Sequence, residues 1–277
     1  MRQLQHKVAV ITGAAGGIGR ALTQQLINAG CHLALADLNT QGLDALAAEF
    51  QDSPQRVTCH KVDVRSYQAM TAFAASVKEL HGGAHLLINN AGLTVFGNFA
   101  DMSIEQIDTV LNVNLRGVVY GCKAFLPLLS SAAAGDSGGA HIVNISSLAG
   151  MVGFPMQTTY CASKFGVRGL SQALRIELGS RGIGVTGVMP GTIATPFLET
   201  AASHDQDMTQ QLAKYMLRHG TPPQRLAKRI LRAVQSNRHE IVVGPDSVLT
   251  WWGQNFVPWL MRWVLALLHK RFEGPQS

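Results

Sequence analysis

Two residues with complementary proton chemistry, Tyr160 and Lys164, lie four positions apart in a stretch with helical character. That spacing places both side chains on one face of a helix. A phenol with a pKa of about 10 is a poor proton shuttle at neutral pH, but a neighbouring ammonium favours the phenolate. Ser147 precedes the tyrosine by 13 residues and is predicted to hydrogen-bond a substrate oxygen, and Asn114 to hold a water between Lys164 and solvent. The set predicts proton transfer at an alcohol or carbonyl oxygen.

A glycine-rich turn joins the first apolar run of the chain to a helix-length stretch. It reads Thr12-Gly13-Ala14-Ala15-Gly16-Gly17-Ile18-Gly19. Glycines let the backbone turn tightly and approach a ligand closely, and the free N–H groups of the next helix attract a pyrophosphate. The spacing is GxxxGxG, with Ala15 where the GxGxxG pattern has its second glycine. The turn predicts a dinucleotide cofactor.

Asp37 closes the second apolar run, 18 residues past Gly19. A carboxylate there accepts hydrogen bonds from the adenosine ribose hydroxyls of NAD and repels the extra phosphate of NADP. Two unit charges about 4 Å apart repel by up to ~4 kcal/mol at an effective dielectric constant of ~20, and half of that is roughly a 30-fold preference. No Lys or Arg follows immediately to neutralise a phosphate. The sequence favours NAD without excluding NADP.

Together these residues resemble the short-chain dehydrogenase/reductase family over roughly residues 5 to 245. The motifs are Thr12-Gly13-xxx-Gly17-Ile18-Gly19, Asp63-Val64, Asn89-Asn90-Ala91-Gly92, Asn114, Ser147, Tyr160-xxx-Lys164 and Pro190-Gly191. The resemblance implies a Rossmann-type enzyme with Asn114, Ser147, Tyr160 and Lys164 as its catalytic set. Ser146 is an alternative serine, which the family's spacing to the tyrosine disfavours.

The same resemblance implies where the cofactor binds. Asp63 and Val64 would border the adenine, Asn90 to Gly92 would pack beside the cofactor, and Pro190 to Thr195 would touch the nicotinamide end. The implied cofactor-binding residues are Gly13, Gly17, Ile18, Gly19, Asp37, Asp63, Val64, Asn90, Ala91, Gly92, Tyr160, Lys164, Pro190, Gly191, Ile193 and Thr195. No metal site is expected.

Seven short apolar runs alternate with helix-length stretches of about 12 to 25 residues, the connection that parallel strands need. Because the runs are apolar throughout, each is expected to be buried on both faces. The pattern predicts an α/β fold with a doubly wound, seven-stranded parallel sheet and helices on both faces. It forms one domain, 1–245, extended by an apolar segment, 246–277. The expected strands are 8–11, 33–36, 57–62, 86–88, 142–145, 184–188 and 241–243.

Composition narrows the class of protein. The 277 residues are 47% hydrophobic and only 14% charged, which excludes a disordered chain. The four cysteines lie far apart without a CxxC pair, and the ten histidines lack metal-ligand spacing. The N-terminus has no signal-peptide pattern, so a cytoplasmic location is expected. The net charge of +6 permits an anionic partner, but no motif indicates nucleic acid.

Two segments interrupt the alternation. Residues 194–220 are long and polar, as a mobile substrate lid would be. The extension carries all four tryptophans within 251–263, and Pro258 predicts the start of a helix running to about Arg271. That helix is too short to span a bilayer. It would either lie in a membrane interface through residues 251–271, with His269-Lys270-Arg271 at the edge, or pack on the substrate cleft or a second subunit.

The sequence therefore favours an NAD-dependent enzyme that interconverts a secondary alcohol and a ketone. An apolar tail beside the lid suggests a hydrophobic substrate such as a steroid, a retinoid or a long-chain hydroxy or oxo compound. Met151, Phe154, Met156, Phe197 and Leu198 are expected near its pocket. One alternative is a 3-oxoacyl-carrier-protein reductase using NADPH, for which a basic helix at 225–232 argues mildly. Another is an NAD-binding redox sensor without turnover. The resemblance implies a homo-oligomer, a dimer or a tetramer.

Overall fold

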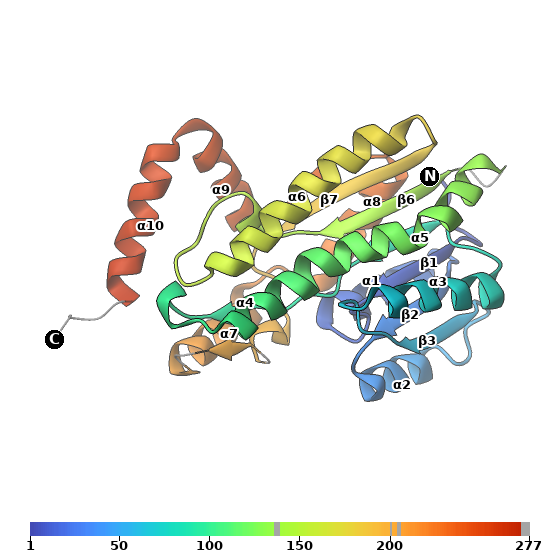
Figure 1. The fold of residues 1–277 in the computed structure, drawn as a ribbon, viewed down its shortest axis with the longest axis horizontal. Coiled ribbons are helices and arrows are strands. Elements are labelled where there is room, and N and C mark those ends of the chain that lie inside the picture. Colours follow the sequence, from blue (N-terminus) through green and yellow to red (C-terminus); the bar gives the residue numbers. More distant parts are fainter. Residues whose placement is uncertain (136–138, 200, 204–205, 273–277) are drawn as a thin grey trace.

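A parallel β-sheet forms the centre of the molecule in the computed structural model, which describes residues 1–135, 139–199, 201–203 and 206–272 (Figure 1). Its seven strands follow the order β3-β2-β1-β4-β6-β7-β9, and every neighbouring pair is parallel. The predicted seven-stranded sheet is thus confirmed. The strands are β1 Val8–Thr12, β2 His32–Asp37, β3 Val57–Lys61, β4 Leu86–Asn89, β6 Ala140–Ile145, β7 Ile183–Pro190 and β9 Glu240–Val243.

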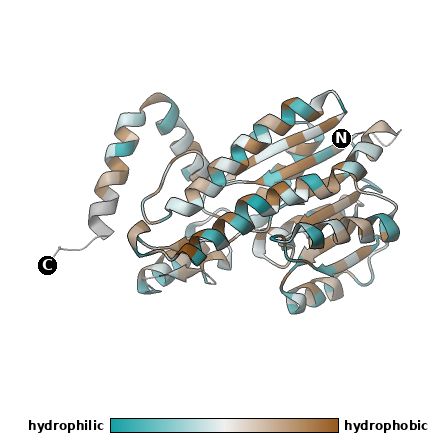
Figure 2. Cartoon of the chain, in the orientation of Figure 1, coloured by the Kyte–Doolittle hydropathy of each residue, from teal (hydrophilic) through white to brown (hydrophobic). Residues whose placement is uncertain are grey.

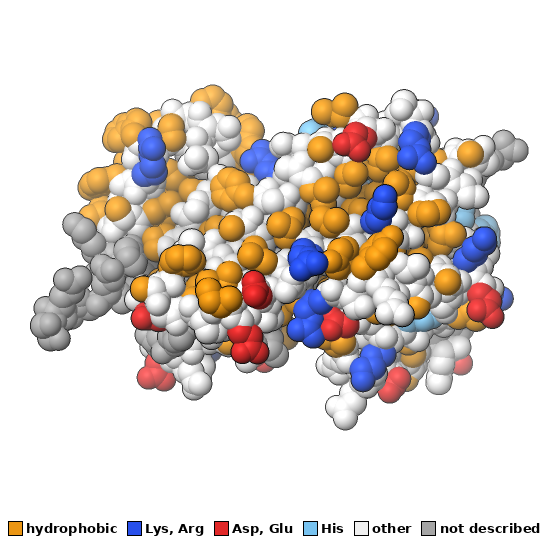
Figure 3. Space-filling view, viewed as in Figure 1, with side chains coloured by type: hydrophobic (Ala, Val, Ile, Leu, Met, Phe, Trp, Pro, Cys, Tyr) orange, Lys and Arg blue, Asp and Glu red, His pale blue; other side chains and the backbone are white. Residues whose placement is uncertain are grey.

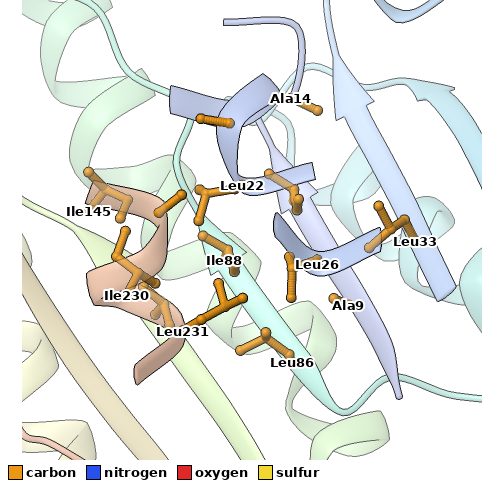
Figure 4. Close-up of a cluster of buried hydrophobic side chains, with 14 of the residues drawn as sticks. Ala9, Ala14, Leu22, Leu26, Leu33, Leu86, Ile88, Ile145, Ile230 and Leu231 are labelled. Atoms are coloured by element: carbon orange, nitrogen blue, oxygen red, sulfur yellow. The ribbon is translucent and has the colours of Figure 1, made fainter. Parts of the chain in front are cut away.

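Helices cover both faces of this sheet, so successive strand residues enter two different cores. On one face Ile88 of β4 packs with Leu22 and Leu26 of the first helix and Ile230 (Figure 4). That layer consists of α1 Gly17–Asn28, α2 Thr40–Glu49 and α8 Pro223–Gln235. The opposite layer consists of α3 Tyr67–His81, α5 Gly117–Ala134 and α6 Thr158–Gly179. Burial on both faces explains why the central strands are mainly apolar, as Figure 2 shows for the middle of the fold. The expectation that every strand is apolar and buried on both faces was wrong for the edge strand β3, which carries Thr58, His60 and Lys61 and is only partly buried.

The strand order reverses between β1 and β4, which are neighbours although β2 and β3 come between them in the chain. After β1 the chain continues to β2 on one side of β1, and after β3 it returns to form β4 on the other side. The connections that follow β1 and β4 therefore lead in opposite directions along the sheet. In doubly wound sheets this reversal opens a crevice at the carboxyl ends of the strands, where ligands bind. The glycine turn after β1 and the Asn90 segment after β4 both begin at that edge.

A continuous helical stretch, Ile104–Ala134, comprises α4 Ile104–Leu111, a π-helical turn η2 Asn112–Arg116, and α5. By length and composition it could cross a membrane. However, α5 packs against β4, β6 and α3 and contributes Phe125 to the second core. It is therefore a core helix of the fold.

The predicted lid segment, 194–220, folds into short elements, apart from residues 200, 204 and 205, which lie outside the described part. They are a 3-10 turn η4 Pro196–Leu198, a strand β8 Ala202–Ser203 and a helix α7 Gln206–His219. β8 pairs in parallel with β5 Val95–Phe96, a second small sheet that the sequence pattern did not reveal because each strand has only two residues.

The tail forms two helices, not one. The predicted start at Pro258 is confirmed by α10 Pro258–Phe272, but a further helix, α9 Pro245–Phe256, precedes it. In Figure 1 the two helices form a hairpin at one end of the molecule, with α10 standing apart from the sheet. The side chains of residues 268–272, including the predicted edge residues His269, Lys270 and Arg271, lie outside the described part.

Candidate active site

One cavity of about 1110 Å³ runs along the carboxyl edge of the sheet, from the glycine turn to α7 and α10. Most of the predicted site residues line it, although their positions in the chain extend from 13 to 195. Those residues are Gly13, Gly17, Ile18, Asp37, Asp63, Val64, Asn90, Ala91, Gly92, Ser147, Tyr160, Lys164, Pro190, Gly191, Ile193 and Thr195. The predicted site residues Gly19 and Asn114 do not line the cavity.

The glycine turn is packed too tightly for side chains. Gly13 has a φ of +64°, and a Cβ there would lie 2.7 Å from the Cα of Ala91. At Gly19 a Cβ would lie 2.7 Å from the Cα of Ala14 and would meet the carbonyl oxygen of Gly13. The turn therefore passes directly into the N-terminus of α1, where Gly16, Gly17 and Ile18 line the cavity. This is a suitable cradle for the pyrophosphate of a dinucleotide.

Thr12 and Asn90 lock this turn to the segment after β4. The Thr12 hydroxyl oxygen accepts hydrogen bonds from the backbone N–H groups of Asn90 and Ala91, at 3.1 and 3.2 Å. The Asn90 side-chain amide donates in return to the carbonyl oxygens of Thr12 and Gly13, at 3.1 and 2.9 Å. Thr12 was part of the sequence motif but was not predicted as a site residue, because its role depends on a contact 78 residues away.

At the other end of the turn, the Asp37 carboxylate accepts from two backbone N–H groups, those of Ala15 and Asn39, both at 3.0 Å. These bonds hold it at the cavity wall with lone pairs to spare for a ligand hydroxyl. Asp63 also lines the wall, but its carboxylate is bound by Arg65, with the closest atoms 2.7 Å apart. The hydrogen bonds from Arg65 hold the pKa of Asp63 below its usual value, although burial opposes them.

Tyr160 and Ser147 meet near the middle of the cavity. Ser147 follows β6 and starts the 3-10 turn η3 Leu148–Gly150, while Tyr160 lies in the first turn of α6. Both side chains line the cavity, and the Ser147 hydroxyl interacts with the Tyr160 phenol. Burial raises the pKa of Tyr160 to about 12, and the hydrogen bond from Ser147 only partly offsets this. The phenol is therefore neutral at pH 7 in the protein alone.

Lys164 lies beneath this pair and is almost completely buried. Its Nζ donates to the carbonyl oxygen of Ile145 at 3.0 Å and lies 5.6 Å from the centre of the Tyr160 ring. Burial lowers the pKa of Lys164 to about 8. The sequence predicted that the ammonium and the positive nicotinamide ring together favour the phenolate, and this stays a prediction. In the protein alone, burial disfavours the charged form of both side chains.

Asn114 occupies the π-helical turn between α4 and α5, a kind of distortion that often marks functional positions. Its side chain bonds the backbone N–H and carbonyl of Leu93, at 2.9 and 2.8 Å, and donates to the Ser163 hydroxyl at 3.2 Å. A Cβ on Gly92 would lie 3.2 Å from Asn114 Oδ1 and 3.5 Å from Lys164 Nζ. The two side chains therefore lie on the same side of Gly92, and a water held by Asn114 that links Lys164 to solvent stays a prediction.

The loop after β7 is fastened to the tail, which sequence reasoning missed. The backbone N–H of Thr192 donates to the Asp246 carboxylate at 2.6 Å, and the Ser247 hydroxyl donates to the carbonyl of Met189 at 3.2 Å. Asp246 and Ser247 both lie in the first turn of α9. On its other side this loop meets the glycine turn, where a Cβ on Gly17 would lie 2.8 Å from Thr195 Cβ.

Beyond Tyr160 the cavity is lined by apolar side chains of the lid and the tail. The Phe197 ring lies 6.4 Å from the Tyr160 ring, and Leu265 of α10 closes the far wall. Four of the five apolar residues predicted near the pocket line it, but Met151 is buried elsewhere, beyond η3. The lining comprises Phe96, Phe154, Met156, Phe197, Leu198, Met208, Leu212, Tyr215, Met216 and Leu265.

No group of three or more His, Cys, Asp or Glu side chains that could hold a metal ion occurs among the described residues. All four cysteines are free thiols. Cys161, beside the tyrosine, is buried, and burial raises its pKa, so it is not a ready nucleophile.

Comparison with known proteins agrees with this geometry. The family model described as short chain dehydrogenase matches residues 7–206. The chain belongs to the short-chain dehydrogenase/reductase family. It is 38% identical to the mycobacterial oxidoreductase SadH from Mycobacterium tuberculosis over 251 residues, 89% of each chain. It is 35% identical to the oxidoreductase UcpA of Salmonella typhimurium, over 82% of this chain and 84% of that protein.

A solved structure extends the likeness to the cofactor. A short-chain dehydrogenase/reductase from Burkholderia phymatum, in complex with NAD, superimposes with a TM-score of 0.85 at 27% identity, covering 94% of this chain and 97% of that one. Together with the glycine cradle, this makes the chain an NAD(P)-dependent oxidoreductase of Rossmann-type fold. The expected family and fold are confirmed.

Proposed function

We propose that this short-chain dehydrogenase/reductase interconverts an apolar secondary alcohol and its ketone, with NAD as the preferred cofactor. The observation that carries the proposal is the position of the neighbouring Ser147 and Tyr160 side chains in the cavity, between the cofactor cradle and a wall of apolar side chains. A substrate oxygen that reaches Tyr160 leaves the rest of the substrate against Phe197, Leu212 and Leu265.

The bound nicotinamide would supply or accept the hydride. The residues of this chain manage the proton and the substrate oxygen. In the oxidative direction Tyr160 Oη, as the phenolate, takes the proton from the substrate hydroxyl, and in reduction the neutral phenol donates a proton to the substrate oxygen. Ser147 donates to the same substrate oxygen and orients it. The Lys164 ammonium holds positive charge 5.6 Å from the phenol ring and thereby stabilises the phenolate while it exists.

Asp37 supports the choice of NAD. Its carboxylate is fixed by Ala15 and Asn39 at the end of β2, next to the glycine cradle. There it would accept a ribose hydroxyl and repel a phosphate on the same ribose. Leu38, the next residue along the cavity wall, carries no charge that would offset the repulsion.

A spectrophotometric assay of the reduced nicotinamide tests the proposal. The purified full chain is offered NAD or NADP with a series of secondary alcohols that runs from small and polar to large and apolar. We expect the highest kcat/KM with NAD and large apolar alcohols. Tyr160→Phe should lower kcat by about 10²- to 10⁴-fold, the usual contribution of an acid–base group.

The control is cofactor affinity, measured by titration, which Tyr160→Phe should change little. Activity restricted to NADP(H), or to small polar substrates, would contradict the cofactor or the substrate part of the proposal. NAD binding without turnover of any substrate, unchanged in Tyr160→Phe, would instead favour the non-catalytic sensor.

A further inference from the structure

The hairpin of α9 and α10, residues 245–272, exposes large apolar side chains at a much higher density along the chain than the rest of the molecule; we name it the tail hairpin. It contains ten of the twenty large hydrophobic side chains that are exposed among the described residues. Three of them are tryptophans, Trp252, Trp259 and Trp263, with 53, 66 and 59% of their surface exposed. In Figure 3 apolar side chains gather over this end of the molecule. Contiguous exposed apolar surface of this kind normally marks an interaction site.

The two sides of α10 lie in different environments. Leu265 faces inward, is only 8% exposed and lines the cavity. At about 100° per residue, Trp259, Trp263 and Leu267 lie on the opposite side of the helix, together with Leu260 and Val264. All five are exposed. The outer face is thus apolar and lacks a partner within the described part of the chain, while the inner face belongs to the substrate pocket.

The charges of the segment indicate what covers that face. No acidic residue occurs between Asp246 and Glu273, whereas Arg262, Lys270 and Arg271 are cationic. Arg262 is exposed, at the edge of the apolar face of α10. Indole rings prefer the boundary between lipid headgroups and hydrocarbon, and cationic side chains bind anionic headgroups. This combination suits an anionic bilayer.

The dimensions of the hairpin agree with docking on a bilayer and not with crossing it. The 15 residues of α10 extend about 22 Å at 1.5 Å per residue, short of the ~30 Å hydrocarbon core. The hairpin also projects from the body in Figure 1. A protein partner would need a groove of matching shape for such a ridge, whereas a fluid lipid surface accommodates it directly.

We propose that the tail hairpin docks this enzyme on an anionic lipid bilayer, with α10 lying in the interface. Trp259 and Trp263 enter the boundary region, and Arg262 contacts headgroups. Because Leu265 lines the catalytic cavity from the same helix, docking brings the apolar end of the cavity next to the lipid. If the proposed function holds, an alcohol or ketone dissolved in the bilayer then has a short path to Tyr160.

The chain carries its own probe for this test, since all four tryptophans lie within residues 251–263. The full-length protein, without cofactor or substrate, is mixed with vesicles of phosphatidylcholine alone or with about 30% phosphatidylglycerol. We expect co-sedimentation with the anionic vesicles, a blue shift of tryptophan emission, and quenching by brominated lipid. High salt should weaken the binding, because it screens the headgroup charge.

The double variant Trp259→Ser/Trp263→Ser should reduce vesicle binding about tenfold or more, since binding scales with the apolar area that enters the interface. The matched control is Leu80→Ser/Ile176→Ser, which removes two exposed apolar side chains from α3 and α6. It should bind vesicles as the parent does. Both variants should keep the far-ultraviolet circular dichroism of the parent, because the replaced side chains are exposed.

Two results would overturn the proposal. One is unchanged emission and no sedimentation with either vesicle. The other result has two parts. Without lipid, the tryptophan emission is already blue-shifted and protected from quenching by acrylamide, and the protein is an oligomer that Trp259→Ser/Trp263→Ser dissociates. The tail hairpin would then be covered by a second copy of the chain and not by lipid. Neither measurement involves turnover, so a failure here is distinct from a failure of the proposed function.

Discussion

The two ends of the cavity are constructed by different means. At the cofactor end, backbone approaches backbone: a Cβ on Gly13 would lie 2.7 Å from Ala91 Cα, and Thr12 and Asn90 bind the two connections together. At the substrate end the wall consists of side chains from η4, α7 and α10. Backbone contacts tolerate almost no change of residue type, whereas an apolar wall needs only suitable volume. The first end should therefore be sensitive to a single methyl group and the second should not.

The largest effect is expected at Gly13. In Gly13→Ala the methyl group meets Ala91 and the residue must keep a φ of +64°, which costs an alanine about 1–2 kcal/mol before any clash. The turn has to shift, and we expect NAD affinity, measured by titration, to fall about 100-fold or more. Gly16→Ala is the control, since its methyl group would lie 3.5 Å from the nearest atom. Equal losses in both variants would show that the loop is generally fragile and not specifically close-packed at Gly13.

Asp37 tests whether cofactor choice at this end is electrostatic. Asp37→Asn removes the charge and keeps one side-chain oxygen, which can replace one of the two acceptors that bind Ala15 and Asn39. If charge repulsion of about 2 kcal/mol excludes NADP, the ratio of kcat/KM for NAD to that for NADP should fall roughly 30-fold. An unchanged ratio would mean that shape, and not charge, determines the preference.

The sheet that supports both ends has its own pH dependence, through His141 in β6. The Thr186 hydroxyl donates to the Arg238 carbonyl, so His141 Nε2 must be the donor to Thr186 at 2.8 Å, and its buried Nδ1 has no partner among the described residues. Burial lowers the pKa of His141 to about 3. An unfolded histidine titrates at about 6.5, so between these values the unfolded chain binds one more proton and acidification destabilises the fold.

From this group we expect a loss of about 1.4 kcal/mol in the free energy of unfolding per pH unit below 6.5, about tenfold in the equilibrium constant. Denaturant unfolding at a series of pH values measures it. His141→Gln keeps an N–H donor but does not titrate, so its stability should depend less steeply on pH. Parallel curves for parent and variant would assign the acid sensitivity to other groups.

The smallest effect is expected at the substrate wall. Leu265→Ala removes a methine and two methyl groups from the cavity wall, and one such group in contact with a substrate is worth about 0.8 kcal/mol, roughly a four-fold effect. We expect KM for a large apolar alcohol to rise a few-fold, with kcat and the KM for NAD nearly unchanged. Leu267→Ala, on the outer face of the same helix, is the matched control. A similar rise in both variants would indicate that the helix itself had moved.

The sequence alone determined the parts of this protein that depend on local spacing. The apolar runs predicted all seven strands, because parallel strands buried on both faces can hardly be anything but apolar. Helical spacing put Tyr160 and Lys164 on one face, and the glycine turn with Asp37 indicated the cofactor end. Each of these depends on residues within one or two neighbouring elements.

Only the tertiary structure decided what depends on contacts between distant segments. The carboxylate of Asp246 bonds a loop 54 residues earlier in the chain, and β8 pairs with β5 across more than 100 residues. The raised pKa of Tyr160 and the lowered pKa of Lys164 follow from burial, which spacing does not report. Leu265 and Leu267 of α10 are residues of the same type, and only packing directs one into the cavity and leaves the other exposed.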